Sequence, residues 1–568
     1  MTPPRLSSAK IDWHAALHAV ASHEVLRPAA LAAKPRSARA GLKQKLPKVL
    51  AQLNALVGPR FPEIAKSPVP VLLPFDTGAF LNDHALGAAG DPNELSPRYM
   101  SGFHARTFFF PGPSGYDAAF AVRPADVPDL ADISFPEPFQ VHISGSSLLY
   151  ELDDAVVATG APVPDLEADF PGIRRLIHEH HLRYTFVRFG VPYVVSIGCS
   201  EAGVRLYRFP SCKAADRVAL RFVKALRVVG GMPQPQRTIE SPPIERPQEA
   251  SPSFSFEQPG RLLPGTGFAR RDGKADSTVY SQIRFPLAEA PAFVNSQMFQ
   301  ARNKPRAAGH LPNYAYPWRD NFCERRGFVV GQCPAGLGHQ GQDIRPALCE
   351  PAAGQDRCPP HDLVAVRDGA IMRSPKQEAV YLVVNTAHEH LRFRYLHMNP
   401  RKMDADELLS GRLVHEGEII AHMSNFHRRE GGTSYHLHFD VQVPTRHGWV
   451  FVNPYMTLVA AYERLIGARG EQLSEPVLVA SADPTATASV GKPTRLERPS
   501  AKPSKSAKRK GYERKAQKGR SAQKARKATS KAAYRPSKSA AYRPGKSKAA
   551  KSKAAKSKPP KNRRSASR

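Results

Sequence analysis

The sequence lacks the long hydrophobic runs that would carry a chain across a membrane. No stretch approaches the ~18 apolar residues of a transmembrane helix. A signal peptide is not visible either, because His, Glu and Arg interrupt the one candidate stretch, "AALHAVASHEVLRPAALAA". We therefore expect no transmembrane segment, and the sequence leaves any export route open.

The sequence also lacks CxxC pairs, which argues against zinc-ribbon and thioredoxin-like sites. The six cysteines lie in two groups, a close pair and a cluster of four: Cys199, Cys212, Cys323, Cys333, Cys349 and Cys358. Their even number and clustering predict disulfides in an oxidising compartment such as the bacterial periplasm. The alternative is a set of buried free thiols in a cytosolic protein.

The end of the chain has almost no acidic residues and few large apolar side chains. Residues 501–568 contain 26 Lys and Arg against the single acid Glu513, a net charge of +25 that leaves +7 of the total +32 for the first 500 residues. With little apolar surface to bury, this tail cannot offset the entropy of ordering, so we expect disorder. Such a polycation predicts binding to anionic polymers, either nucleic acid or envelope polymers. The alternative is a solvated extension without function.

A chain of 568 residues predicts two or three domains. Short stretches rich in β-branched and aromatic residues predict an α+β domain in the amino-terminal half, and "HEHH" within it (His178, Glu179, His180 and His181) reads as a solvated polar face rather than a metal site. The predicted order is a basic helical region (1–60), an α+β domain of unknown role (61–232), a Pro-rich linker (233–275), a second compact domain (276–468, core 326–458), another linker (469–500) and the tail (501–568).

Five residues of the second domain suggest a site. In "GGTSYHLHFDV", His436 and His438 are two apart in a predicted strand, so both side chains point to the same face. Upstream, "GLGHQGQDIRP" places His339 and Asp343 on a predicted turn that enters a strand, and in "LRFRYLHMNP" a predicted strand ends at His397.

This set of residue types is suited to catalytic zinc. Such an ion takes three nitrogen or oxygen ligands from the protein and keeps a fourth position for water. It then makes hydroxide available near neutral pH and polarises a carbonyl group. Five candidate residues exceed the four that a structural ion needs, and that surplus favours catalysis.

Residues 326–458 resemble the lysostaphin-type (LytM-like) zinc endopeptidases of bacterial cell-wall turnover. The resemblance rests on the ordered motifs "HQGQD", "LVAVRDGAI", "YLVVNT", "RYLHM", "VHEGEIIAHMSN", "YHLHFDV" and "FVNPY". It implies a mainly antiparallel β-sandwich or barrel of the duplicated hybrid motif type. It also implies that His339, Asp343 and His438 bind zinc and that His436 and His397 act in catalysis, without deciding which of those two is the general base.

The resemblance implies a zinc-dependent endopeptidase that cleaves peptide bonds of peptidoglycan in the periplasm, at the cell envelope or outside the cell. One alternative is a catalytically silent regulator of other hydrolases, with the Pro-rich connection or residues 281–325 covering the site; the intact ligand set favours the enzyme. Another is a polyanion-binding protein that acts through its tail. The bond cleaved, the role of the amino-terminal domain and the oligomeric state stay open.

Two further expectations come from departures from the family pattern. The segment after Asp343 is longer than usual and contains two cysteines, and a Cys333–Cys349 bridge would stiffen the ligand turn, although six cysteines allow 15 pairings. The remaining histidines of the domain match no family motif and are expected at the surface: His361, His388, His390, His415, His422, His427 and His447.

Overall fold

The computed structural model divides the chain into two units, Met1–Val479 and Ala480–Arg568. It describes residues 1–21, 38–91, 97–153, 160–178, 181–200, 209–235, 239, 241–248, 253–296, 314–347 and 360–473. The predicted disorder of the tail and the partners of Cys349 and Cys358 therefore lie outside the described residues. Within them the protein is mostly β, with several antiparallel sheets and few helices, so the predicted multidomain β-rich fold is confirmed.

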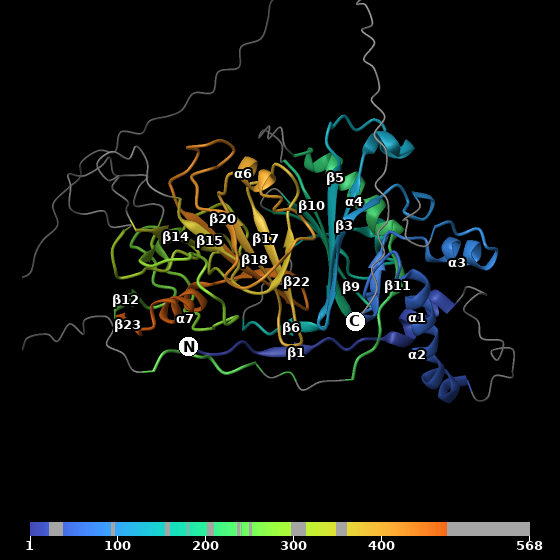
Figure 1. Ribbon diagram of the computed structural model, residues 1–568, viewed down its shortest axis with the longest axis horizontal. Coiled ribbons are helices and arrows are strands. Elements are labelled where there is room, and N and C mark those ends of the chain that lie inside the picture. The colour runs from blue at the N-terminus through green and yellow to red at the C-terminus, as the bar shows by residue number, and fades with distance from the viewer. Residues whose placement is uncertain are drawn as a thin grey trace, which may run out of the picture. The chain divides into compact units, whose positions relative to one another are not determined.

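The amino-terminal half is built on an antiparallel sheet with the strand order β3-β4-β5-β10-β9-β8-β7 (Figure 1). Its strands are β3 (His104–Gly112), β4 (Gly115–Val122), β5 (Phe139–Ser146), β7 (Ala161–Pro162), β8 (Arg174–His178), β9 (His181–Arg188) and β10 (Val191–Gly198). Alternation explains why β9 forms here: Leu182, Tyr184 and Phe186 are buried, and the residues between them are more exposed.

Helices and short strands complete this half and close its core. They are α1 (Trp13–Ala21), α2 (Ala38–Val57), α3 (Thr77–Ala85), α4 (Cys212–Ala225) and the antiparallel pair β2 (Val71–Leu73) and β11 (Arg227–Gly230). Ser211 caps α4 by accepting a hydrogen bond from the backbone N–H of Ala214. At the ends of the "HEHH" segment, His178 is the last residue of β8 and pairs with His181, the first residue of β9.

The second half is built on another antiparallel sheet, with the order β13-β14-β21-β18-β17-β16-β19 and β22 paired to β21. Its strands are β13 (Ala292–Val294), β14 (Gln342–Pro346), β16 (Gly369–Met372), β17 (Val380–Asn385), β18 (His390–Leu396), β19 (Leu413–Val414), β21 (Leu437–Thr445) and β22 (Gly448–Val452). Around it lie the antiparallel pair β15 (Asp362–Val364) and β20 (Ile419–His422), the parallel pair β12 (Phe254–Glu257) and β23 (Gly470–Leu473), and the helices α6 (Pro400–Ala405) and α7 (Tyr455–Ile466).

The two halves meet across a buried polar centre. Asp117 of β4 accepts hydrogen bonds from Arg392 and contacts Nε2 of His390 at 2.9 Å, both on β18, and the indole of Trp449 donates to Ser144. His390 was expected at the surface, and that expectation is wrong, because its side chain is fully buried. The reason is that the first sheet covers the face of β18 that points away from the second core.

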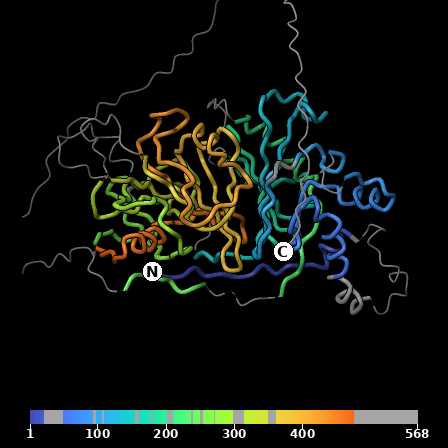
Figure 2. The backbone as a smooth tube through the Cα atoms, viewed as in Figure 1, coloured from blue at the N-terminus to red at the C-terminus, as the bar shows by residue number. Residues whose placement is uncertain are grey.

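The amino-terminal stretch runs along both halves (Figure 2). The backbone N–H of Thr2 donates to Ser277, β1 (Leu6–Ser8) pairs with β6 (Leu148–Tyr150), and the N–H of Asp12 donates to Phe189. Residues that are far apart in the sequence are therefore joined by backbone hydrogen bonds. The predicted domain boundaries within residues 1–468 stay a prediction.

Two disulfides are present among the described cysteines, Cys199–Cys212 and Cys323–Cys333. The expected Cys333–Cys349 bridge is wrong, because the sulfur of Cys333 is bonded to that of Cys323. Cys323 is the nearer partner in sequence and lies beside the ligand turn, where its backbone N–H donates to His339.

Among the helices of the described residues, we find none long and apolar enough to cross a membrane.

Candidate metal centre and catalytic site

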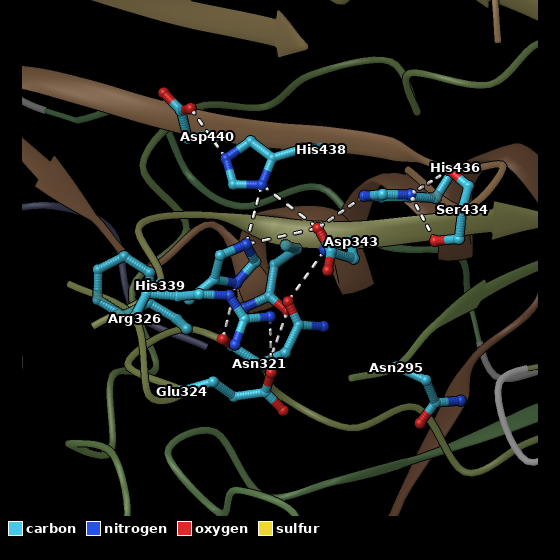
Figure 3. A network of polar contacts seen from close by, with 12 residues as sticks. Asn295, Asn321, Glu324, Arg326, His339, Asp343, Ser434, His436, His438 and Asp440 are labelled. Atoms are coloured by element: carbon cyan, nitrogen blue, oxygen red, sulfur yellow. Dashed lines mark hydrogen bonds and ion pairs between the residues drawn. The ribbon is translucent and has the colours of Figure 1, made fainter. Parts of the chain in front are cut away.

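Three neighbouring strands of the second sheet bring the five predicted site residues together near the strand ends. In the antiparallel register Asp343 of β14 lies opposite His438 of β21, and His438 lies opposite Leu396 of β18. His397 follows Leu396 directly, and His436 directly precedes β21. His339 lies on the turn before β14, which places its ring beside the same point (Figure 3).

The three predicted metal ligands converge closely. Nε2 of His339 is 2.9 Å from Nδ1 of His438, and Oδ1 of Asp343 is 3.4 Å from the first nitrogen and 3.3 Å from the second. All three side chains are buried. Four-coordinate zinc with bonds of about 2.1 Å separates its ligand atoms by roughly 3.4 Å. The two sides of the triangle that end at Asp343 match this spacing, and the nitrogen–nitrogen side, at 2.9 Å, is shorter.

A hydrogen bond fixes which nitrogen of His339 carries the hydrogen. Nδ1 of His339 donates to the carbonyl of Asn321 at 2.9 Å, so its Nε2 presents a lone pair. That lone pair faces Nδ1 of His438 at 2.9 Å, and Nδ1 of His438 lies 3.3 Å from Oδ1 of Asp343. Nε2 of His438 faces Oδ2 of Asp440 at 3.3 Å. With the hydrogen of His438 on this Nε2, the three facing atoms would each present a lone pair to a cation between them.

Electrostatics at this point favour positive charge. Burial acts to lower the pKa of His438, but Asp343 and Asp440 outweigh it and raise that pKa above its ordinary value. Burial likewise acts to raise the pKa of Asp343, but His339 and His436 hold it well below its usual range. Oδ2 of Asp343 is buried without a hydrogen-bond partner. An ionised carboxylate with an unused oxygen is what a metal ligand needs, so the residues fit a divalent ion.

The two predicted catalytic histidines flank the triangle. Nδ1 of His436 donates to the carbonyl of Ser434 at 2.8 Å, which leaves Nε2 with a lone pair, 3.3 Å from Oδ1 of Asp343. Nδ1 of His397 contacts the carbonyl of Phe426 at 3.1 Å, and its ring centre is 4.9 Å from that of His436. Backbone carbonyls therefore set the same tautomer in both rings and leave both Nε2 atoms able to accept a proton.

Burial, together with the neighbouring His436 and His438, lowers the pKa of His397 well below its ordinary value, so this ring is neutral at physiological pH. Burial also lowers the pKa of His339 to about 4. His397 has a left-handed backbone, with φ of 74°. This conformation is uncommon for residues other than glycine, and such residues occur often at functional sites.

Gly341, the middle residue of "HQGQD", allows the two ligand strands to approach. A Cβ at this position would lie 2.4 Å from the carbonyl oxygen of Phe439 and 3.0 Å from Nε2 of His438. A side chain here would therefore push β14 away from β21. Gly341 is therefore needed so that β14 and β21 can place their ligands close together, and not only to form a turn.

The sequence did not reveal the residues whose hydrogen bonds position the metal ligands. Asn321 accepts from His339 through its backbone carbonyl, and its side-chain oxygen accepts from the backbone N–H of Asp343 at 2.9 Å. Arg394 donates to Asp440, which faces His438. Asp440 was visible as the acid that follows HxH by two residues. Asn321 had no such signal, because it lies in an aperiodic stretch more than fifteen residues upstream.

A buried acid also lies beside the ligand turn. The backbone carbonyl of Glu324 accepts from the N–H of His339, and burial raises the pKa of the Glu324 carboxyl to about 8. Arg326 lies 3.7 Å from that carboxyl. Asn321, Glu324 and Arg326 thus lie beside His339 (Figure 3).

Comparisons with known proteins give little beyond this geometry. No protein-family profile and no curated protein matches the sequence. Among solved structures, a protein described as a glycyl-glycine endopeptidase LytM from Ruminococcus gnavus is similar, with 18% identity over 34% of this chain and 63% of that chain and a TM-score of 0.19. This chain thus spans less than two thirds of that protein. No fold or function is assigned from the similarity at this TM-score.

Proposed function

We propose that the protein is a zinc-dependent endopeptidase that hydrolyses peptide bonds of bacterial peptidoglycan. The observation that supports the metal site is the convergence of Nε2 of His339, Nδ1 of His438 and Oδ1 of Asp343, three buried atoms that can each ligate a cation between them. The ordered motifs shared with lysostaphin-type endopeptidases support the substrate class. Zinc is the proposed ion because two histidines and one carboxylate are a common catalytic zinc set.

His339, Asp343 and His438 would hold the ion, which supplies Lewis-acid activation of a water molecule and of the substrate carbonyl when bound. His436 is the better candidate for the proton acceptor. Its Nε2 carries a lone pair, and Asp343, at 3.3 Å, stabilises the imidazolium that forms when the proton arrives. His436 then returns this proton to the leaving amine.

His397 is suited to the developing negative charge on the substrate. Its ring is partly exposed, whereas the other four site residues are buried. Because its Nδ1 is fixed on the carbonyl of Phe426, Nε2 is the atom that faces substrate. The ring is neutral at rest; as negative charge develops on the substrate, Nε2 would take up a proton from solvent and donate a hydrogen bond to the tetrahedral intermediate, and the proton would leave again when the intermediate collapses.

The two disulfides support a location at the cell envelope or outside the cell, since disulfides persist in oxidising compartments. Peptidoglycan is found there, so location and substrate agree. The proposed binding of the polycationic tail to anionic polymers concerns residues outside those that the structure describes, and it stays a prediction from charge.

The test uses the full chain. Tightly bound metal is quantified, and the protein is incubated with purified peptidoglycan while new amino and carboxyl ends are counted. We expect about one tightly held zinc per chain and cleavage that His438→Ala abolishes with the metal. His436→Ala should keep the metal and lose at least about 100-fold in rate, and His415→Ala, an exposed histidine, should change neither. Full cleavage by metal-free His438→Ala would refute the proposal.

A further inference from the structure

A second group of metal-ligating side chains lies beside the first. Glu378, His397 and His427 each place one ligating atom within 4.8 Å of the others. Nδ1 of His427 is 3.3 Å from Oε1 of Glu378, and the ring centres of His427 and His397 are 5.7 Å apart. Neither Glu378 nor His427 has a part in the proposed hydrolysis.

One turn of the chain orients all three groups. The backbone N–H of Arg428 donates to Oε2 of Glu378 at 2.8 Å, which leaves Oε1 directed at His427. Arg428 has φ of 62°, and His427 and Arg429 form a backbone bridge around it, so the turn is tight. Phe426, just before the turn, fixes the tautomer of His397 through its carbonyl. Backbone contacts of this kind orient the ligands of metal sites.

We propose that Glu378, His397 and His427 form a second divalent-cation site, which inhibits the enzyme when zinc is in excess. Two imidazoles and a carboxylate are again a zinc-type donor set. His397 would bind the second ion through Nε2, the same atom that the proposed hydrolysis uses. An ion at this position therefore takes His397 out of the reaction. The inhibitory part of the inference rests on the proposed function, whereas the binding part does not.

The second site is the weaker of the two. Its ligating atoms are up to 4.8 Å apart, whereas roughly 3.4 Å suits four-coordinate zinc, so binding must draw the ligands together. The side chain of His427 is 43% exposed and that of Glu378 21%, so the ring can rotate and the ion can enter from solvent. Ordering these side chains costs free energy that the preformed first site does not lose.

The binding test is a titration of the metal-free full chain with zinc ions alone, followed by calorimetry. We expect a tight step and a weaker step. His427→Asn and Glu378→Gln should each weaken the second step at least about tenfold and spare the first, and His438→Ala should remove only the first. Glu378→Gln keeps an oxygen for the N–H of Arg428, so the turn is preserved. His388→Asn, an exposed histidine outside the group, is the control and should change neither step.

The activity test measures peptidoglycan cleavage as zinc is raised beyond one equivalent. Cleavage should fall in the wild type and in His388→Asn, and the inhibiting zinc concentration should rise at least about tenfold in His427→Asn. The zinc titration could instead show a single binding step that His438→Ala removes and His427→Asn leaves intact. This result would refute the second site while sparing the proposed function. A single step that His438→Ala leaves intact would refute the primary site instead. A rise in cleavage as the second step fills would refute inhibition.

Discussion

At the scale of single residues, the site depends on one position that has no side chain. In Gly341→Ala the added methyl group would lie 2.4 Å from the carbonyl of Phe439 and close to the ring of His438. We expect a loss of about 1–3 kcal/mol in the free energy of unfolding, as in other overpacked sites, together with weaker zinc binding. Thermal unfolding and a zinc titration measure both.

Gly327→Ala is the matched control, because a Cβ there meets no atom within 4 Å. It should leave both the free energy of unfolding and the zinc affinity close to those of the wild type. If the two substitutions have equal effects on stability and zinc affinity, these effects come from the changed conformational freedom of the backbone. The close approach of β14 to β21 at Gly341 would then not be critical.

Asn321 is predicted to tune metal affinity without touching the metal. In Asn321→Ala the backbone carbonyl still accepts from His339, but Asp343 loses the side-chain oxygen that accepts from its N–H. Residues that orient metal ligands typically contribute 10–100-fold to affinity, so we expect a loss of about tenfold or more. Asn399→Ala, which removes a similar backbone contact at the start of α6, should leave zinc affinity unchanged. Unchanged affinity in Asn321→Ala would argue against its orienting role.

At the scale of secondary elements, the Cys323–Cys333 disulfide braces the ligand turn. The N–H of Cys323 donates to the carbonyl of His339, and a Cβ on Gly338 would collide with both half-cystines. Replacing both cysteines by alanine should lower the free energy of unfolding by about 2–3 kcal/mol, as the short loop predicts, and weaken zinc binding.

The Cys199–Cys212 bridge offers a control with nearly the same loop length. Its removal should lower stability by a similar amount, but zinc affinity should be unchanged because the bridge lies in the amino-terminal half. Measuring unfolding and zinc affinity for both double variants separates the two effects. Loss of zinc affinity in both, or in neither, would contradict a specific brace.

The sequence predicted the strands of the site well because local pattern specifies them. Alternation and the motifs placed β18 before His397, β14 after the His339 turn and β21 at the HxH pair. It could not place Asn321 or Asp320, since the stretch around them has no period and its role depends on hydrogen bonds to residues far along the chain, such as Gln342. The Cys323–Cys333 pairing likewise depends on the fold and not on spacing.

At the scale of the whole molecule, no local pattern indicates that the two halves share a buried centre. His390 and Arg392 follow one another at a spacing of two along β18, as residues of a solvated face do. The acid that contacts both of them, Asp117, lies more than 270 positions away. Tertiary contact overrides the local pattern here. Because this face of β18 is covered by the first sheet, experiments on the site should use the full chain.

Asp117→Asn tests this centre through stability and its dependence on pH. Burial acts to raise the pKa of Asp117, but Arg392 and His390 outweigh it and hold that pKa below its ordinary value. The ionised carboxylate therefore stabilises the folded state above its unfolded pKa of about 4. This stabilisation is lost as pH falls through the lower folded value.

We expect Asp117→Asn to lower the free energy of unfolding at neutral pH by about 3–5 kcal/mol, since it leaves Arg392 buried without its counter-charge. Denaturant unfolding between pH 7 and pH 3 measures the difference from the wild type, which should shrink below about pH 4, where Asp117 of the unfolded wild type takes up a proton. Asp129→Asn, which breaks an exposed ion pair with Arg221, should cost less than about 1 kcal/mol. If Asp117→Asn costs no more than this control, the two halves do not depend on the buried charges, and the covering of β18 by the first sheet is incidental to the site.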